Sequence, residues 1–162
     1  MSTVKKQVEI TVRLDNEPTA MGRLMAAVAT CGAEVLAASS YCSYDGAVVM
    51  LITDDEPRTS LALTAAGFDC RQDSVLLVQI PEKPGLAPLL GAKLIAAGIQ
   101  VLYSYSFRSD NQGYVVFKTT DDSRAFYLLE VEALVHELAA AKSWRGTEII
   151  PFEEEEVQVQ AA

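Results

Sequence analysis

The segment from Glu82 to Leu86 combines one acidic and one basic side chain with the pair Pro84-Gly85. Apolar residues at helical spacing follow it, so the free N–H groups of a helix start should lie beside these charges. Those N–H groups and Lys83 could receive a carboxylate, whereas Glu82 or a strand carbonyl could receive an ammonium group. The segment would therefore suit a small zwitterion such as an α-amino acid. A solvated turn is the alternative, which these residues alone favour.

Other residues that often carry chemistry have simpler interpretations. His136 is the only histidine and falls on an expected helix with acidic neighbours, as is typical of a helix surface. Asp54-Asp55 and Asp121-Asp122 could hold a cation, but each pair precedes an expected helix, where aspartate caps free N–H groups. The cysteines are too widely spaced for a structural zinc site; they are Cys31, Cys42 and Cys70. We expect no metal, no cofactor and no catalytic residue, and hence no enzyme.

Aromatic side chains alternate along one expected strand, at Tyr103, Tyr105 and Phe107. Such a stripe could stack nucleic-acid bases. However, the 162-residue chain carries 13 basic and 22 acidic side chains, a net charge of −9, and phosphate binding depends on Lys and Arg. Packing in a core or between domains is therefore the favoured interpretation, and we expect no nucleic-acid partner.

The chain contains one unit twice. When the sequence is shifted by 66 positions, Val12 aligns with Val78. After a one-residue insertion, the Thr-Asp-Asp triplet at 53–55 aligns with the triplet at 120–122. The insertion falls at an expected turn, where extra residues are tolerated. The repeat predicts two copies of one small fold.

Each copy has the same order of expected elements: strand, helix, hairpin, helix and closing strand. In the first copy they cover residues 8–14, 21–31, 35–44, 47–53, 55–67 and 68–73, and in the second 75–80, 86–97, 101–108, 114–120, 121–141 and 146–152. Asp45-Gly46 predicts a type I′ turn in the first hairpin, since both residues accept positive φ. The order βαββαβ predicts an α+β protein of two ferredoxin-like units, each an antiparallel sheet with both helices on one face.

We expect the first unit at residues 7–73, the second at 74–152 and an acidic C-terminal tail at 153–162. The closing strand of the first unit runs directly into the second, so the units should pack closely. No stretch approaches the roughly 20 apolar residues that a membrane span needs. Glu9 also interrupts the segment where a secretion signal would have its apolar core. The sequence therefore predicts a cytoplasmic protein with no membrane partner.

The segment Ile80-Pro81-Glu82-Lys83-Pro84-Gly85-Leu86, followed by Gly98-Ile99-Gln100-Val101, resembles the signature of the ACT family, the amino-acid-sensing domain of many biosynthetic enzymes. Two such domains would cover residues from about 8 to 152, as in stand-alone tandem ACT proteins. The resemblance implies a ligand site between the turn before the helix of one domain and the start of the next strand across an interface. In the first copy Thr19 stands where Gly85 stands in the second, and its Cβ hinders close approach of a ligand. The candidate binding residues are Glu82, Lys83, Pro84, Gly85, Leu86, Ile99, Gln100, Val101, Asn16 and Glu17.

The resemblance thus implies a non-catalytic regulatory protein that binds an amino acid at an interface between ACT domains. It would signal through its oligomeric state or its contacts with a partner. A homodimer is expected from the resemblance alone. The alternative is a ligand-independent interaction subunit of an amino-acid biosynthetic enzyme or of a transcription regulator.

Overall fold

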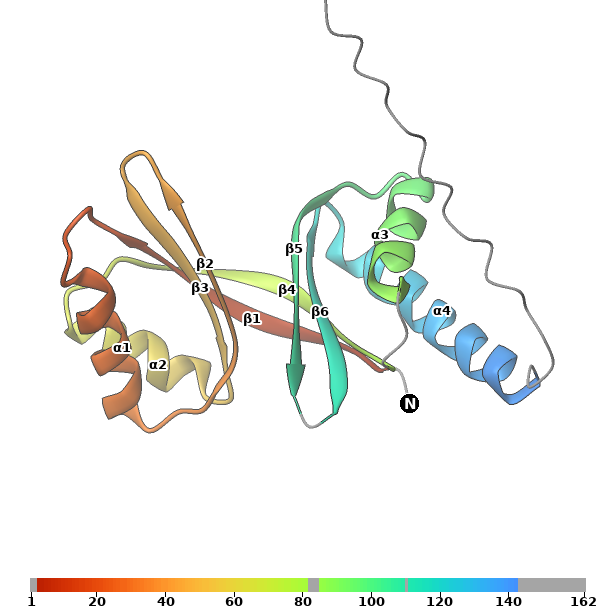
Figure 1. Ribbon diagram of the computed structural model, residues 1–162, viewed down its shortest axis with the longest axis horizontal. Coiled ribbons are helices and arrows are strands. Elements are labelled where there is room, and N and C mark those ends of the chain that lie inside the picture. The colour runs from red at the N-terminus through yellow and green to blue at the C-terminus, as the bar shows by residue number, and fades with distance from the viewer. Residues whose placement is uncertain (1–2, 82–84, 110, 143–162) are drawn as a thin grey trace, which may run out of the picture.

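The computed structural model of the chain describes residues 3–81, 85–109 and 111–142, which form strands and helices in the order shown in Figure 1. In chain order they are β1 (Thr3–Leu14), α1 (Ala20–Cys31), β2 (Val35–Ser43), β3 (Gly46–Thr53), α2 (Glu56–Ala65), β4 (Cys70–Ile80), α3 (Leu86–Ala96), β5 (Val101–Ser109), β6 (Gln112–Thr119) and α4 (Asp122–Lys142). The chain has the expected α+β fold.

The described strands form a single antiparallel sheet with the order β2-β3-β1-β4-β6-β5. The sequence predicts one sheet for each unit, and these two sheets are joined at their centre. β1 and β4 pair along ten residue positions, from Thr3 to Val12 of β1. β3 pairs with β1 at Ile10–Leu14, and β6 pairs with β4 at Leu76–Ile80. Both central strands are therefore shared, and the boundary expected between residues 73 and 74 falls within β4.

We call α1, β2, β3 and α2, with the adjoining parts of β1 and β4, the first half of the molecule. The second half consists of α3, β5, β6 and α4 with the remaining parts of the same two strands. In Figure 1 the helices lie on the outer sides of the two halves, and the hairpins β2–β3 and β5–β6 lie between them. The helices thus cover one face of the sheet, and the other face lines the junction between the halves.

The N-terminal part of β1 lies where the closing strand of the second unit was expected. Val4 of β1 pairs with Val78 and belongs to the core of the second half. Lys6 extends over the ring of Phe126 on α4, with its Nζ 3.4 Å from the hydroxyl of Ser123. The strand expected at 146–152 lies outside the described residues, and the position beside β4 that it would take is occupied by β1.

Helix boundaries follow the local signals in the sequence. Asp55 caps α2 by accepting a hydrogen bond from the backbone N–H of Arg58 at 3.1 Å. Asp121 does the same for α4, accepting from the N–H of Arg124 at 2.9 Å. Gly32 ends α1 with a φ of 72°, a left-handed conformation that glycine adopts readily. The interpretation of the aspartate pairs as caps is confirmed at both helices.

The first hairpin differs from the predicted type I′ turn. Its two-residue loop is Tyr44-Asp45, because Ser43 pairs with Gly46. Asp45 is not among the described residues with positive φ, whereas Gly46 has a φ of 143°. A Cβ on Gly46 would lie 2.0 Å from the carbonyl oxygen of Leu14. Glycine is therefore required here by the close approach of β1 and by the positive φ of Gly46, not by a type I′ turn.

Two hydrophobic cores lie beneath the helices, one in each half. The first packs α1 and α2 against β1 and β3 around the fully buried Leu24, Leu51 and Leu63. The second packs α3 and α4 against β4 and β6 around Leu94 and Phe117. Each core is small, so neither half buries as much apolar surface as a single larger domain would.

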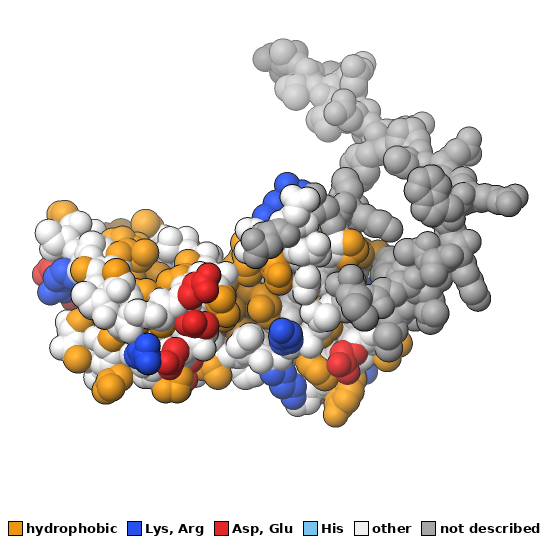
Figure 2. All heavy atoms as spheres, turned by 90° about the horizontal axis from the view of Figure 1, so that it is seen from below, with side chains coloured by type: hydrophobic (Ala, Val, Ile, Leu, Met, Phe, Trp, Pro, Cys, Tyr) orange, Lys and Arg blue, Asp and Glu red, His pale blue; other side chains and the backbone are white. Residues whose placement is uncertain are grey.

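A third hydrophobic cluster fills the junction between the halves. Ala37 and Ile52 of the first hairpin meet Val116 of the second, with Val75 of β4 between them. Tyr105 and Phe107 pack against this cluster, so the aromatic stripe packs between the halves as the sequence analysis favoured. On the face seen in Figure 2, hydrophobic side chains also gather where the two halves meet.

One buried carboxylate lies at this junction. Glu9 of β1 has no exposed surface and accepts hydrogen bonds from the hydroxyls of Tyr103 at 2.5 Å and Tyr105 at 2.7 Å. Burial raises the pKa of both phenols, and the hydrogen bonds to the negative charge of Glu9 raise it further. We call these three residues the Glu9 cluster; it ties β1 to the edge strand β5.

The shared strands predict that the two halves unfold together. Leu24→Ala removes a buried side chain from the first half only and should lower the free energy of unfolding by about 2–5 kcal/mol. Because β1 and β4 belong to both halves, amide protection in α3, β5 and β6 should fall by the same amount, as measured by hydrogen exchange with mass spectrometry. Leu61→Ala, at an exposed site on α2, is the matched control. Unchanged protection in the second half would show that the halves are independent.

The Glu9 cluster predicts a loss of stability at high pH. The phenols of the unfolded chain ionise with the ordinary pKa of 10.0, whereas those of Tyr103 and Tyr105 stay protonated in the folded protein. Their contribution is therefore complete below pH 10 and decreases as the pH rises above it, because the unfolded chain loses these protons and the folded chain keeps them. Urea unfolding between pH 8 and 11 measures this slope.

Glu9→Gln should make that slope shallower, because the phenols lose the neighbouring negative charge. It should also lower the free energy of unfolding at pH 7 by about 1–3 kcal/mol, since the buried amide N–H₂ would face hydroxyl groups that donate to Glu9 in the wild type. Glu130→Gln at an exposed position of α4 is the control and should change neither quantity. Equal slopes for the wild type and Glu9→Gln would contradict the role given to Glu9.

Candidate functional site

A cavity of about 510 Å³ lies between the two hairpins, on the face of the sheet that the helices leave free. Its volume is in the range of small-molecule sites. Residues from every strand contribute to its walls, and hydroxyls, charges and apolar groups are all present. The lining residues are Thr11, Ser39, Tyr41, Val48, Met50, Arg71, Asp73, Leu102, Tyr103, Ser104, Tyr105 and Lys118.

Strand register brings the charged residues to this cavity. Glu9 of β1 lies directly opposite Asp73 of β4, and Thr11 lies opposite Arg71. Side chains at directly opposed positions share one face of the sheet. Lys118 of β6 is likewise the register partner of Tyr103 on β5. Charged and polar residues that are far apart in the sequence therefore lie close together at this cavity.

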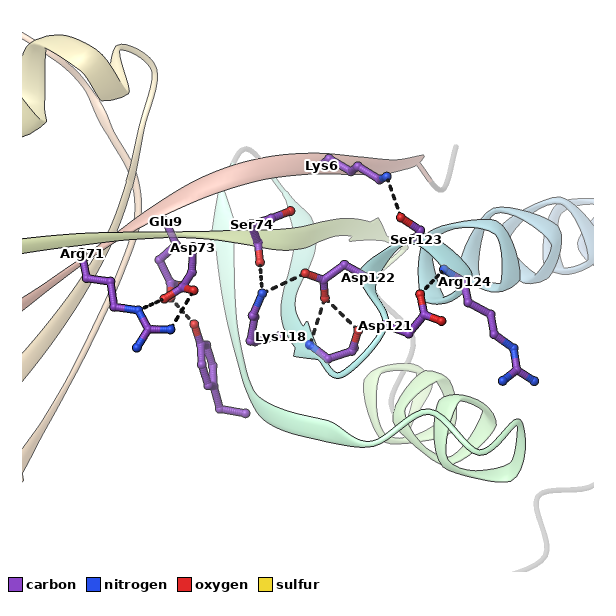
Figure 3. A network of polar contacts seen from close by, with 12 residues as sticks. Lys6, Glu9, Arg71, Asp73, Ser74, Lys118, Asp121, Asp122, Ser123 and Arg124 are labelled. Atoms are coloured by element: carbon purple, nitrogen blue, oxygen red, sulfur yellow. Dashed lines mark hydrogen bonds and ion pairs between the residues drawn. The ribbon is translucent and has the colours of Figure 1, made fainter.

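Arg71 and Asp73 form an ion pair on β4. The guanidinium donates to both carboxylate oxygens, with the atoms 2.9 Å and 3.1 Å apart. The Arg71 side chain is 77% exposed and that of Asp73 is 22% exposed, so the pair lies at the mouth of the cavity rather than inside a core. Figure 3 shows Arg71 pointing toward Asp73 beside Glu9. An ion pair this exposed adds little to stability.

Lys118 of β6 is held by groups of β4 and α4. Its Nζ donates to the carbonyl oxygen of Ser74 at 2.7 Å and to the carboxylate of Asp122 at 2.8 Å (Figure 3). Burial by itself would raise the pKa of Asp122, but hydrogen bonds from Lys118 and Thr119 outweigh burial and hold that pKa below its usual value. The ammonium group is thus fixed in position by two acceptors.

Seven of the ten residues predicted from the sequence are described by the structure, and these seven do not converge in one chain. Glu82, Lys83 and Pro84 lie outside the described residues. Gly85 precedes α3 with a φ of 82°, and a Cβ there would meet nothing within 4 Å. Leu86, the first residue of α3, is buried in the second core. The start of α3 therefore has the open glycine that the sequence analysis assigned to a ligand turn.

Ile99, Gln100 and Val101 lie at the other end of α3. Its 11 residues place the two ends about 16 Å apart. Ile99 is buried, and Val101 begins β5. Gln100 is exposed; its carbonyl accepts from the backbone N–H of Thr120 at 3.0 Å, and its own N–H donates to the Thr120 hydroxyl at 3.3 Å. A site that includes Gly85 and Gln100 would therefore need two chains.

Asn16 and Glu17 lie on the turn between β1 and α1, in the first half. The backbone N–H of Glu17 donates to the carbonyl of Asp15 at 2.7 Å, and its carbonyl accepts from Ala20 at 3.1 Å. Its carboxylate is 4.0 Å from Arg23, with both side chains mostly exposed. Thr19 precedes α1 without a side-chain cap. This turn is closed by its own contacts and does not line the cavity between the halves.

The sequence analysis named the aromatic stripe but missed the residues that meet it. Glu9 was considered only as an interruption of an apolar segment, and Arg71, Asp73 and Lys118 were not considered. An acidic residue between apolar residues of a strand is a usable signal, since a buried carboxylate needs donors. Its partners could not be found because they lie 94 and 96 positions away.

Within the described ranges, no three His, Cys, Asp or Glu side chains are grouped to hold a metal ion. Cys31, Cys42 and Cys70 are free thiols. None of the helices in the described part of the chain is both long and apolar enough to cross a membrane.

The sequence matches no known family model and no curated protein. Solved structures do share its fold. The protein BT0572 from Bacteroides thetaiotaomicron has a TM-score of 0.74 at 19% identity, covering 80% of this chain and 90% of that one. The regulatory subunit of aspartate kinase from Thermus thermophilus, in its ligand-free form, has a TM-score of 0.57 at 13% identity, covering 80% and 94%.

A putative C-terminal regulatory domain of aspartate kinase from Porphyromonas gingivalis W83 gives a TM-score of 0.53 at 19% identity, again covering 80% of this chain and 94% of that one. At identities of 13% to 19% these likenesses show a shared fold. Two of the three structures are regulatory parts of aspartate kinase. The resemblance to tandem ACT domains is therefore confirmed at the level of the fold: the chain has the architecture of an aspartate kinase regulatory subunit.

Proposed function

We propose that this chain is a non-catalytic regulatory protein that binds an amino acid. The observation that most supports this is the extent of the fold likeness, which covers 80% of this chain and 94% of a regulatory subunit of aspartate kinase. A fold by itself does not determine function. The open glycine at the start of α3 adds a local feature, because backbone N–H groups at a helix start suit a carboxylate.

The ligand would bind between two copies of the chain. The start of α3 from one copy would meet the start of β5 from the other, since these segments lie at opposite ends of α3 within one chain. This proposal implies a homodimer. Ligand binding would favour whichever dimer arrangement or partner contact has the higher affinity for the amino acid. The signal would be read by a partner such as a biosynthetic enzyme or a transcription regulator.

The alternative function is a protein contact that needs no ligand. A second cavity of about 530 Å³ lies between α3 and β5 and has mainly apolar walls, including Ala87, Gly91 and Ile95. Ile95 is 65% exposed. An exposed apolar side chain beside an apolar cavity is typical of protein interfaces.

The two functions differ in the response to amino acids. In thermal unfolding of the full chain with each of the twenty amino acids, at least one should raise the midpoint. A ligand at 100 times its dissociation constant stabilises the folded state by about 2.7 kcal/mol. An unchanged midpoint with every amino acid would refute regulation by amino acids and leave the ligand-independent contact as the function.

A pair of glycine variants tests the start of α3. Gly85→Asn keeps the left-handed backbone, which asparagine tolerates, but places a side chain where a ligand carboxylate would bind. Gly67→Asn is the matched control, since Gly67 has a φ of 86° and equally open surroundings after α2, away from both segments of the proposed site. Gly85→Asn should abolish the amino-acid-induced increase in midpoint, whereas Gly67→Asn should retain it. Equal responses would place that site elsewhere.

A further inference from the structure

We propose that the cavity between the two halves is a second ligand site, which takes an α-amino acid with an apolar side chain. The ammonium group would bind beside Tyr103, Tyr105 and Asp73, and the carboxylate beside Arg71 and Lys118. The choice of an amino acid as ligand rests on the proposed function. The site differs from the one proposed above, because neither the start of α3 nor the residues predicted from the sequence line this cavity.

The Glu9 cluster gives one wall of the cavity its acceptor character. Tyr103 and Tyr105 each use their only hydroxyl proton in a hydrogen bond to Glu9. Both tyrosines line the cavity, so their oxygens have only lone pairs to offer a ligand there. The Asp73 carboxylate, on the strand beside Glu9, adds further acceptors. Acceptors without protons recognise a donor such as an ammonium group.

Charge favours a cation at the same place. Glu9 and Asp73 are like charges at directly opposed positions of neighbouring strands, an arrangement that destabilises a sheet. Arg71 pairs with Asp73, but the two hydrogen bonds to Glu9 come from neutral hydroxyls. A ligand ammonium beside the tyrosines would offset the remaining negative charge. The charge around Glu9 and Asp73 thus favours a cation in this part of the cavity.

Arg71 and Lys118 provide donors for a carboxylate beside these acceptors. Arg71 donates two of its five N–H groups to Asp73, which leaves three. Lys118 donates to Ser74 and Asp122, which leaves one of its three protons. Both side chains are held by their present partners and so need little ordering on binding.

Apolar side chains complete the site. Val48 and Met50 project from β3, and Leu102 comes from β5 on the other half. An aliphatic ligand side chain would bury its surface against them, and a cavity of about 510 Å³ leaves room for it. Because the walls come from both halves, such a ligand would fix one hairpin relative to the other.

Calorimetric titration of the full chain tests this site with four probes: L-leucine, L-isoleucine, L-valine and L-methionine. At least one should bind. Asp73→Asn and Arg71→Gln should each weaken that affinity at least about tenfold, as expected for the loss of a hydrogen bond to a charged group. Asp69→Asn and Arg124→Gln remove the same charges from exposed sites outside the cavity and should change the affinity by less than about twofold. Both cavity variants alter partly exposed side chains, and circular dichroism verifies their folding.

Two further measurements separate this site from the start of α3. Two analogues of leucine each lack one charged group: 3-methylbutylamine lacks the carboxylate, and 4-methylpentanoate lacks the ammonium group. Asp73→Asn should weaken binding of the amine but not of the acid, and Arg71→Gln should do the reverse. Gly85→Asn should leave the affinity at the cavity unchanged.

Binding of a probe with undiminished affinity in both cavity variants would overturn the cavity site while the proposed function stands. Failure of all four probes would also overturn it, and a thermal shift with any other amino acid would still support regulation. If none of the twenty amino acids shifts the midpoint, both proposals fail together.

Discussion

The pairing of β1 with β4 is the interaction on which the rest of the structure depends. These two strands are antiparallel over ten positions, and each contributes one part to the first half and one part to the second. Each half has a small core, which would give a separate domain of that size only marginal stability. Sharing two central strands joins both cores through continuous backbone hydrogen bonds. It also fixes which face of the sheet is covered by helices and which lies at the junction.

The junction combines apolar packing with a buried charge. Ile52, Val75 and Val116 provide the hydrophobic contact, and Glu9 is bonded to two tyrosines beside it. Burying a carboxylate is unfavourable unless donors satisfy it, and here the donors come from the edge strand β5 of the second half. The two halves are therefore held in one arrangement by a polar contact as well as by apolar surface. The same contact sets the hydrogen-bonding character of the cavity wall.

The likeness to aspartate kinase regulatory subunits and the local geometry address different questions. The likeness shows a fold in which two similar halves are joined, and two of the matched structures are regulatory. The geometry shows where charges and hydroxyls converge in this chain. In a regulatory protein a ligand must bind two states with different affinity. The walls of the cavity come from both halves, so the binding proposed there would be coupled to the arrangement of the halves.

The sequence by itself determined the repeat, the βαββαβ order and most element boundaries, because hydrophobic periodicity, aspartate caps and glycine stops are local signals. It also identified Gly85 as an open position before a helix. Only the tertiary structure decided that β1 takes the place of the expected strand at 146–152, and that Gly46 is required by the backbone of Leu14. It alone brought Glu9 to Tyr103, and Lys118 to the cavity that Arg71 and Asp73 line. The reason is that strand register and pairing between distant segments depend on the packing of the whole sheet, which no local pattern records.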